Sequence, residues 1–183
     1  LAVAPMKLAK KKVLVQELYC VETLARVDVL CFDKTGTITT GNMNVVEIDE
    51  KVASELSSYL AYFEDENATS RALKNHLTCE KKWDVDEIGA FSSKNKYSYI
   101  QLKEGGTYFF GAYEFLGFEE SMTEYYESLK QQGYRILSLA YTDEKVTTPS
   151  NMKLIGHVVL SDEIKANTKE TFKYFESQGV AVK

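Results

Sequence analysis

The feature that most constrains the fold of this sequence is an apolar run followed by a turn rich in threonine and glycine. The run Val27–Phe32 predicts a buried parallel strand. Asp33 would then lie at the carboxyl end of a strand, where open α/β sheets bind their ligands. Gly36 can adopt a positive φ and let backbone N–H groups approach an anion, and three threonines add hydroxyl groups. The stretch Asp33–Thr39 therefore predicts a carboxylate nucleophile beside a phosphate-binding turn.

An isolated Asp-x-x-Gly would be ordinary turn chemistry. Here seven consecutive residues, Asp33-Lys34-Thr35-Gly36-Thr37-Ile38-Thr39, match the phosphorylation signature Asp-Lys-Thr-Gly-Thr-(Leu/Ile)-Thr, and on this motif the chain resembles the P-type ATPases. The resemblance implies that Asp33, Lys34 and Thr35 are catalytic. It also implies that Asp33 and Thr35 bind magnesium, and that ATP and magnesium are the cofactors.

Composition limits the other classes of function. The chain has 183 residues, which suits one large or two small domains, and a net charge of −5, which argues against a nucleic-acid binder. Cys20, Cys31 and Cys79 lack metal-ligand spacing, so we expect a reducing compartment and core positions. No apolar run reaches the length of about 18 residues that a membrane span needs. Because the chain begins at Leu1, we expect a soluble, monomeric piece of a longer protein.

Residues 1–25 permit two interpretations. Pro5 and the lysines that follow it are typical of a solvated helix start. The same lysines would also suit a juxtamembrane stalk on the cytoplasmic side. The resemblance favours the stalk, because P-type ATPases leave the membrane shortly before the signature. We expect Gln16–Leu24, with Leu18 on its apolar face, to continue as a helix.

The rest of the chain alternates between helix and strand patterns. We expect helices at Ala53–Phe63, from the Asp65–Ser70 turn through Leu77, at Met122–Gln132 and at Asn167–Ser177, and strands at Met43–Ile48, Ile88–Phe91, Lys96–Leu102, Thr107–Gly111, Ile136–Tyr141, Lys153–Leu160 and Val180–Val182. Parallel-type units at both ends thus flank a middle segment with an antiparallel pattern, an α/β fold with an α+β insertion.

This layout resembles the P-type ATPases, in which a nucleotide-binding domain with an antiparallel sheet interrupts a haloacid-dehalogenase-like (Rossmann-type) phosphorylation domain. The phosphorylation domain would be incomplete here. The boundaries that the resemblance implies are a stalk at 1–25, the first part of the phosphorylation domain at 26–42, the nucleotide-binding domain at 43–160 and the return segment at 161–183.

A nucleotide site is implied by Phe91-Ser92-Ser93-x-x-Lys96, which is similar to the family stretch Phe-Ser-x-x-x-Lys. In that stretch the phenylalanine stacks on adenine and the lysine lies near the nucleotide. The resemblance therefore makes Phe91, Ser93 and Lys96 nucleotide-binding candidates. From the residues alone, Phe91 as a core residue on a strand and Lys96 as a surface charge is the favoured alternative.

Further segments resemble the family with departures. Phe110-Gly111-Ala112-x-Glu114 stands in place of Lys-Gly-Ala-Pro-Glu, so Gly111 and Ala112 are nucleotide-binding candidates while a lysine is missing. Ser70 occupies the position of a glutamate that touches adenine in some members. We therefore expect weak ATP or ADP binding.

Two more candidates come from the same comparison. Arg135 lies in Gly133-Tyr134-Arg135-Ile136-Leu137, which matches a family segment whose arginine reaches the phosphates or the facing domain. Asp162 lies where the family has a hinge aspartate, although a helix-capping Asp162 explains the sequence equally well.

The resemblance implies that the longer protein is a cation-transporting P-type ATPase, an integral membrane protein of a bacterial plasma membrane with this region on the cytoplasmic face. The absence of a His-Pro pair favours an ion other than a heavy metal, and calcium is our expectation. Later catalytic segments of the family, Thr-Gly-Asp and Gly-Asp-Gly-x-Asn-Asp, are not in the chain, so we expect it to be inactive alone.

Two alternatives from other classes stay open at this point. A soluble haloacid-dehalogenase-type phosphatase would carry a second aspartate where Thr35 stands. A nucleotide-binding module would leave Asp33 without a chemical role.

Overall fold

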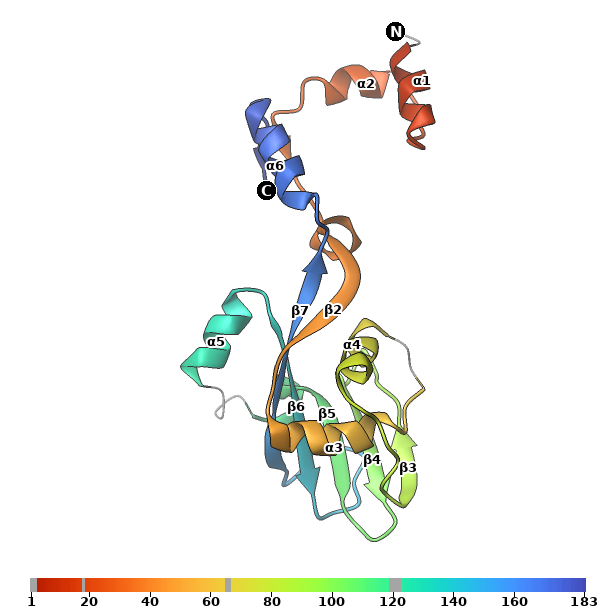
Figure 1. The fold of residues 1–183 in the computed structure, drawn as a ribbon, viewed down its shortest axis with the longest axis vertical. Coiled ribbons are helices and arrows are strands. Elements are labelled where there is room, and N and C mark those ends of the chain that lie inside the picture. Colours follow the sequence, from red (N-terminus) through yellow and green to blue (C-terminus); the bar gives the residue numbers. More distant parts are fainter. Residues whose placement is uncertain (1–2, 18, 65–66, 119–122) are drawn as a thin grey trace. The chain divides into compact units, whose positions relative to one another are not determined.

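The computed structural model describes residues 3–17, 19–64, 67–118 and 123–183 (Figure 1). These described residues divide into two compact units. We call Leu1–Thr40 with Ile164–Lys183 the discontinuous unit, and Gly41–Glu163 the inserted unit. The units divide after Thr40 and after Glu163, near the domain boundaries predicted after residues 42 and 160. The identity of each domain stays a prediction.

The discontinuous unit contains short elements. They are α1 (Val3–Lys10), α2 (Tyr19–Leu24), β1 (Val29–Leu30), the turn η1 (Lys34–Ile38), α6 (Thr168–Ser177) and β8 (Ala181–Val182). Strand β1 pairs in parallel with β8, with Val29 opposite Ala181 and Leu30 opposite Val182, so the predicted parallel pairing is confirmed. Phe32 packs against Phe172 and Phe175 of α6, with ring centroids 5.2 and 6.1 Å apart. This contact joins the residue before Asp33 to the helix.

Two predictions for this unit are wrong. The strand Val27–Phe32 is shorter than expected and is not buried, since Val29 is 42% exposed and Cys31 is also exposed. In the part of the chain that the structure describes, β1 pairs only with β8, and this two-stranded sheet leaves much of the strand surface uncovered. Gln16 is not helical and α2 starts at Tyr19, while Leu18 lies outside the described residues. Helix α1 is followed by Lys12 at a φ of 62°, a conformation that cannot continue a helix.

The inserted unit is built on a mixed set of strands and helices. They are β2 (Thr39–Ile48), α3 (Glu50–Leu60), α4 (Ala68–His76), β3 (Val85–Gly89), β4 (Tyr97–Leu102), β5 (Thr107–Ala112), η2 (Tyr113–Leu116), α5 (Glu124–Gln131), β6 (Arg135–Thr142) and β7 (Lys153–Ile164). Within the described residues the strands form one six-stranded sheet in the order β2-β7-β6-β5-β4-β3. The pairs from β3 to β7 are antiparallel, as predicted for the middle of the chain.

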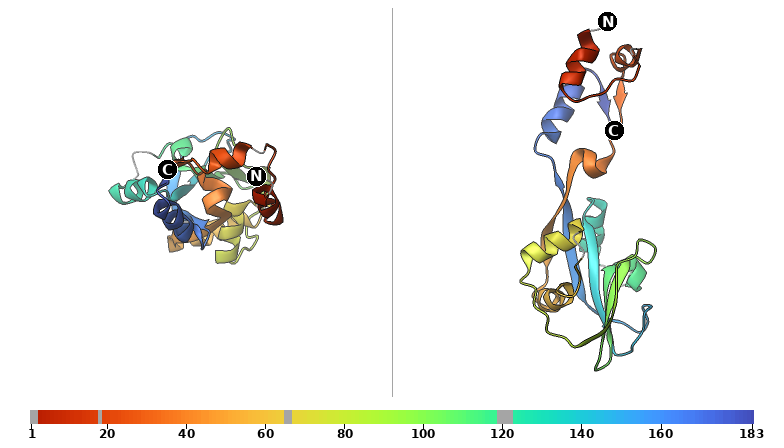
Figure 2. Two further views of the ribbon diagram at one scale, coloured as in Figure 1. Left: turned by 90° about the horizontal axis from the view of Figure 1, so that it is seen from above. Right: turned by 90° about the vertical axis from the view of Figure 1, so that its right-hand side faces the viewer.

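Helices α3 and α4 cover one face of this sheet (Figures 1 and 2). Asp49 begins α3 by accepting a hydrogen bond from the Lys51 amide, and Asn67 begins α4 by accepting one from the Ser70 amide. The buried side chains between the helices and the sheet include Val52, Leu56, Leu73, Ile100, Phe110, Leu139, Val158 and Leu160. A second apolar cluster on the opposite face contains Tyr97, Phe109, Leu116 and Ala140. The middle strands of the sheet are therefore buried on both sides, while the edge strands β2 and β3 are largely exposed.

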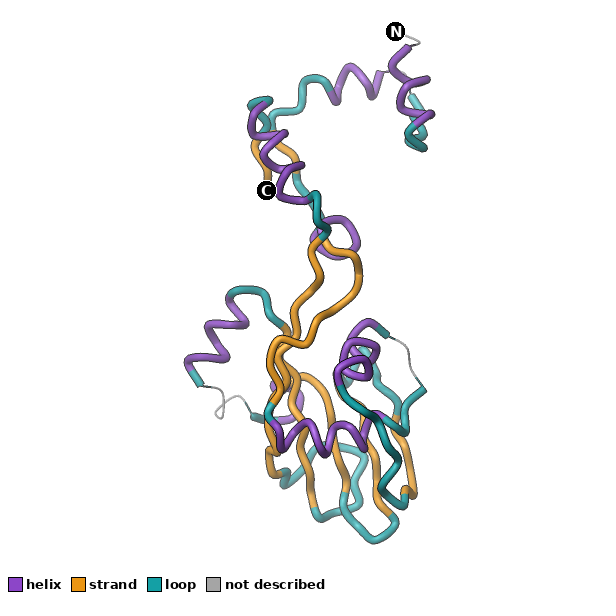
Figure 3. The backbone as a smooth tube through the Cα atoms, in the orientation of Figure 1, coloured by secondary structure: helices purple, strands orange, loops and turns teal. Residues whose placement is uncertain are grey.

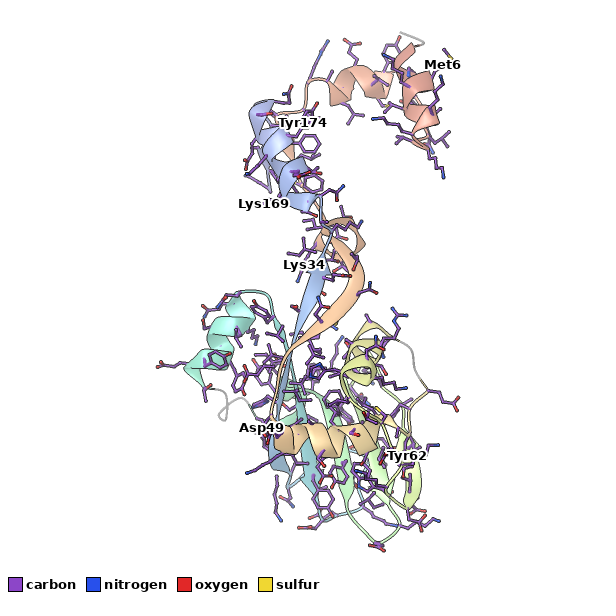
Figure 4. The ribbon with its side chains drawn as sticks, viewed as in Figure 1. Met6, Lys34, Asp49, Tyr62, Lys169 and Tyr174 are labelled. Carbon is purple, nitrogen blue, oxygen red and sulfur yellow. The ribbon has the colours of Figure 1, made fainter. Side chains whose placement is uncertain are left out.

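An aromatic stack closes one end of the α3/α4 face. Trp83 lies nearly parallel to Tyr108, with ring centroids 4.3 Å apart, and nearly parallel to Tyr62, with ring centroids 6.3 Å apart. The Tyr62 hydroxyl also bonds to the backbone of Trp83. Figure 4 shows Asp49 and Tyr62 at the two ends of α3. The stack fixes the loop before β3 to the helix.

Some predicted strand limits are wrong. Strand β3 ends at Gly89 rather than at Phe91, because the Ser92 hydroxyl accepts bonds from the amides of Lys94 and Asn95 and closes a turn there. Strands β2 and β7 are longer than predicted and are neighbours in the sheet (Figure 3). Their polar ends can continue because each strand supplies the hydrogen-bonding partner of the other. The start of the predicted helix at Met122 and the turn residues Asp65 and Glu66 lie outside the described residues.

His157 of β7 is a buried polar residue on the face opposite α3. It is 7% exposed, its Nδ1 lies 2.8 Å from the Ser138 hydroxyl, and its ring packs edge-on against Tyr126 of α5. Its Nε2 is buried and has no hydrogen-bond partner among the described residues. Burial lowers the pKa of His157 below its usual value.

We predict that acid destabilises the inserted unit through this histidine. The folded state keeps His157 neutral, so the unfolded state binds more protons, and the free energy of unfolding falls as pH drops below about 6.5. Urea denaturation followed by circular dichroism at pH 7.5 and pH 5 should show a smaller loss in His157→Asn than in wild type. The exposed His76, changed to Asn, is the control. An equal loss in all three proteins would contradict the assignment.

Candidate functional site

The signature turn follows directly after the parallel strand pair. The amide of Phe32 donates to the carbonyl of Lys183, so the ladder of β1 and β8 continues to the residue before Asp33. Asp33 itself is exposed and has an extended backbone. Gly36 has a φ of 79°, the left-handed conformation that the sequence predicts for this position. The carboxylate of Asp33 is thus accessible at the start of the turn.

The signature turn is held by a hydrogen bond within it and by hydrogen bonds from Lys165 and Thr168. Within it, the Gly36 amide donates to the hydroxyl of Thr39, which is buried. Lys165 donates from its side chain to the Gly36 carbonyl at 2.9 Å and from its backbone to the Ile38 carbonyl. Thr168 of α6 donates its hydroxyl to the Ile38 carbonyl as well. The contacts of Lys165 and Thr168 were not predicted, because these residues lie far along the chain from the turn.

Lys34 and Thr35, the other catalytic candidates, lie on the same turn as Asp33, and both are exposed. Figure 4 labels Lys34 on this turn. Asp33 and Thr35 offer oxygen atoms, which are the ligands that magnesium prefers. Within the described ranges there is no group of three or more His, Cys, Asp or Glu side chains that could hold a metal ion. Two oxygen donors with substrate phosphates and water are still a usual magnesium set, so these residues fit the ion.

The nucleotide-binding candidates of the inserted unit meet at one corner of its sheet. The amide of Ala112 donates to the carbonyl of Lys96 at 3.0 Å, and Gly111 lies opposite Tyr97. A side chain at Gly111 would lie 2.3 Å from the Lys96 carbonyl oxygen, so only glycine fits there. Lys96 has a φ of 62°, a strained conformation for a lysine. Segments that are 15 residues apart in sequence are therefore joined tightly at this corner.

Phe91 and Ser93 lie on the turn that leads into this corner. The turn is closed by the Lys96 amide, which donates to the Ser92 carbonyl at 2.7 Å. Ser93 is exposed, and Phe91 is 49% exposed. Phe91 is therefore neither a strand residue nor a core residue, and the alternative that made it one is wrong. A half-exposed aromatic ring is suited to stacking on a flat ligand.

Arg135 begins β6 on the sheet face that α4 covers. Ala112 lies opposite Leu137, two residues along the strand from Arg135, so the arginine lies near the same corner. Its guanidinium donates to the hydroxyl of Thr69 on α4 at 3.3 Å, and the side chain is exposed. Thr69 was not among the predicted residues. The helix start at Asn67 is the sequence signal that could have pointed to it.

The departures from the family pattern have structural explanations. Phe110, in the place of a lysine, is 7% exposed and packs against Tyr59 with ring centroids 5.9 Å apart. Tyr113, in the place of a proline, is buried beside α5, and its hydroxyl accepts a bond from Lys130. Ser70 is buried on α4. Both aromatic replacements are thus parts of the packing of the inserted unit.

Asp162, the predicted hinge residue, lies inside β7, which runs to Ile164. The alternative that Asp162 caps a helix is wrong, since α6 begins at Thr168. The boundary between the units falls after Glu163, one residue beyond Asp162. Its role as a hinge stays a prediction.

Among the described helices, none has both the length and the apolar character that crossing a lipid bilayer requires. No protein-family model matches the chain.

Relatives with curated descriptions match along the whole chain. The chain is 39% identical to "Probable cation-transporting ATPase exp7" of Streptococcus pneumoniae serotype 4 and spans 25% of that protein. It is 33% identical to the calcium-transporting ATPase CtpE of Mycobacterium tuberculosis and spans 24% of it. The chain thus covers about a quarter of the length of these relatives.

Solved structures agree in fold. The catalytic domain of the CPx-ATPase CopB-B matches with a TM-score of 0.62 at 14% identity, over 97% of this chain and 61% of that one. A zinc-transporting PIB-type ATPase in the E2.Pi state matches with a TM-score of 0.59 at 18% identity, over 92% of this chain and 27% of that one. With the seven-residue signature at Asp33 and the relatives that match its full length, these similarities show that the chain belongs to the P-type ATPases.

Proposed function

We propose that the inserted unit is a nucleotide-binding domain that binds ATP at the corner formed by Lys96, Gly111 and Ala112. The observation that carries the proposal is the direct contact of two segments that resemble the family's nucleotide-binding segments, where the Ala112 amide donates to the Lys96 carbonyl. Phe91 offers an exposed ring for the adenine, and Lys96 and Arg135 offer positive charge for the phosphates. Ser93 would contribute a hydroxyl group from the adjoining turn.

In the longer protein, Asp33 would accept the γ-phosphate. A carboxylate oxygen of Asp33 attacks the γ-phosphorus, the bond to the bridging oxygen breaks, and ADP leaves as an acyl phosphate forms. Magnesium, when bound by Asp33 and Thr35, would supply charge neutralisation for the phosphate oxygens. Lys34 adds a positive charge on the same turn, and the contacts of Lys165 and Thr168 keep the turn in place. Hydrolysis of the acyl phosphate by water would then restore Asp33.

We place the discontinuous unit in a haloacid-dehalogenase-like phosphorylation domain, for which the parallel pairing of β1 with β8 is the support. The longer protein would be a cation-transporting ATPase of a bacterial plasma membrane, with this region on the cytoplasmic face and Asp162 at the hinge. The similarity to calcium-transporting ATPases named CtpE supports calcium as the transported ion.

Removing the ring of Phe91 tests the proposed nucleotide site. We expect Phe91→Ala to weaken ATP binding by about 1–3 kcal/mol, the usual scale of a base–aromatic stack. The melting temperature should change little, because the ring is already half exposed. Isothermal titration calorimetry measures the affinity, and amide NMR shifts locate the site in the wild-type chain.

Phe115 is a matched control, since it is also 49% exposed and lies on η2. Phe115→Ala should leave ATP affinity unchanged. ATP-induced shifts that avoid Phe91, Lys96 and Gly111 would place the nucleotide elsewhere and refute the proposal.

A further inference from the structure

A buried chain of hydroxyl groups adjoins the proposed nucleotide corner along β4 and β5. Tyr59 projects from α3 and is 1% exposed. Its hydroxyl donates to the hydroxyl of Ser98 at 3.0 Å, and the Ser98 hydroxyl in turn donates to the Phe110 carbonyl at 3.4 Å. Burial raises the pKa of Tyr59, so its hydroxyl keeps its proton and remains a donor. These two hydrogen bonds link α3 to β4 and β4 to β5.

These two strand positions adjoin the corner. Ser98 lies opposite Phe110, and the next pair along the two strands is Tyr97 opposite Gly111. The pair after that joins the Lys96 carbonyl to the Ala112 amide. Any shift of β4 relative to β5 at Ser98 therefore moves Lys96 relative to Gly111, where the backbone has no spare room. The hydrogen bonds from Tyr59 to Ser98 and from Ser98 to Phe110 oppose such a shift.

Packing alone does not account for the hydroxyl of Tyr59. Its ring already packs against Phe63 and Phe110, with centroids 5.0 and 5.9 Å apart, and a phenylalanine could make the same contacts. Burying a hydroxyl group costs free energy unless it is hydrogen-bonded, and a buried network whose hydrogen bonds are all made specifies one arrangement of the groups that it joins. Here the arrangement that they specify is the alignment of β4 with β5 at the corner.

We propose that Tyr59 and Ser98 are positioning residues for nucleotide binding, and that they hold Lys96 and Gly111 in the arrangement that receives ATP. The inference rests on the proposed function of the inserted unit. Neither side chain needs to touch the nucleotide. Their effect passes through the backbone of β4 and β5.

The test uses the 183-residue chain with Tyr59→Phe, Ser98→Ala and the double variant. Each single change should weaken ATP binding about three- to tenfold, within the range reported for residues that act at a distance. The double variant should lose no more ATP affinity than the more strongly affected single variant, because both changes interrupt the same series of hydrogen bonds. Affinities are measured by calorimetry at a temperature where circular dichroism shows every variant fully folded.

Tyr62→Phe is the matched control. It removes a hydroxyl that also makes hydrogen bonds, to the backbone of Trp83, from a residue just beyond the end of the same helix. This variant should lose stability but keep its ATP affinity. Equal losses of affinity in Tyr59→Phe and Tyr62→Phe would reduce Tyr59 to a general structural role and overturn the inference.

A measurement without nucleotide separates the two proposals. In the nucleotide-free chain, Tyr59→Phe should shift the amide resonances of Lys96, Gly111 and Ala112 more than those of β6 and β7. If these resonances do not move, Tyr59 does not position the corner, whatever the affinity of ATP. If they move while the wild-type chain binds no ATP, the positioning stands as geometry but the proposed function fails, and with it the role in nucleotide binding.

Discussion

Replacing Asp33 with asparagine in the full-length protein is expected to abolish formation of the phosphoenzyme. The amide is nearly the size of the carboxylate, so the turn that Lys165 and Thr39 hold should keep its shape. An amide is a far poorer nucleophile, and no acyl phosphate can form on it. Acid-quenched labelling with γ-labelled ATP should therefore detect wild type and leave Asp33→Asn unlabelled.

The same substitution should not weaken ATP binding. It removes a negative charge beside the incoming γ-phosphate, and like charges about 4 Å apart at an effective dielectric of about 20 repel by roughly 4 kcal/mol before magnesium screens them. Asp28→Asn is the matched control, since Asp28 is an exposed aspartate that precedes β1 in the same unit. The control should label normally. A labelled Asp33→Asn protein would show that the phosphate is carried elsewhere.

A lysine at position 110, which the family pattern would suggest, is expected to unfold the inserted unit rather than to improve its ATP site. Phe110 is 7% exposed in the cluster beneath α3. Losing a buried phenylalanine costs about 3–5 kcal/mol. Burying an ammonium group without a partner adds a further penalty. Against a typical total stability of about 5–15 kcal/mol, Phe110→Lys should show a large loss in urea denaturation.

Phe110→Leu provides the comparison, because it keeps an apolar side chain and should be much less destabilising. The ATP affinity of the leucine variant should stay close to that of wild type. A Phe110→Lys protein that remained folded and bound ATP more tightly would show that position 110 opens onto the nucleotide. In that case the absence of the lysine would mean the loss of a nucleotide contact, and packing would not explain Phe110.

Much of the inserted sheet was predictable because local pattern and tertiary pairing agree there. The hairpin of β4 and β5 has limits within one residue of the predicted ones, since Gly105 and Gly106 both adopt positive φ in the turn. The edge strand β3 was placed too far along the chain. The Ser92 turn and the pairing with β4 decide where β3 ends. The residue pattern of one strand contains no information on that pairing.

The candidate site was predictable to different degrees. Asp33 and Gly36 are recognisable from consecutive residues, because the whole turn is local in sequence. The exposure of Phe91 was not, since from the residues alone the core interpretation was favoured. The contacts of Lys165 with Gly36 and of Tyr59 with Ser98 join residues 129 and 39 positions apart. Such contacts depend on how the sheet and helices pack, and no local pattern encodes them.

The aromatic stack at Trp83 has a practical consequence for observing this protein. Trp83 is the single tryptophan of the sequence, and it belongs to the inserted unit. Because its indole stacks with Tyr62 and Tyr108, its fluorescence should change when that unit unfolds. The discontinuous unit has no tryptophan, so its melting would be silent in that signal and visible only in the far-ultraviolet spectrum. Emission therefore follows the inserted unit alone, while ellipticity follows both units, and a difference between the two curves reveals separate unfolding.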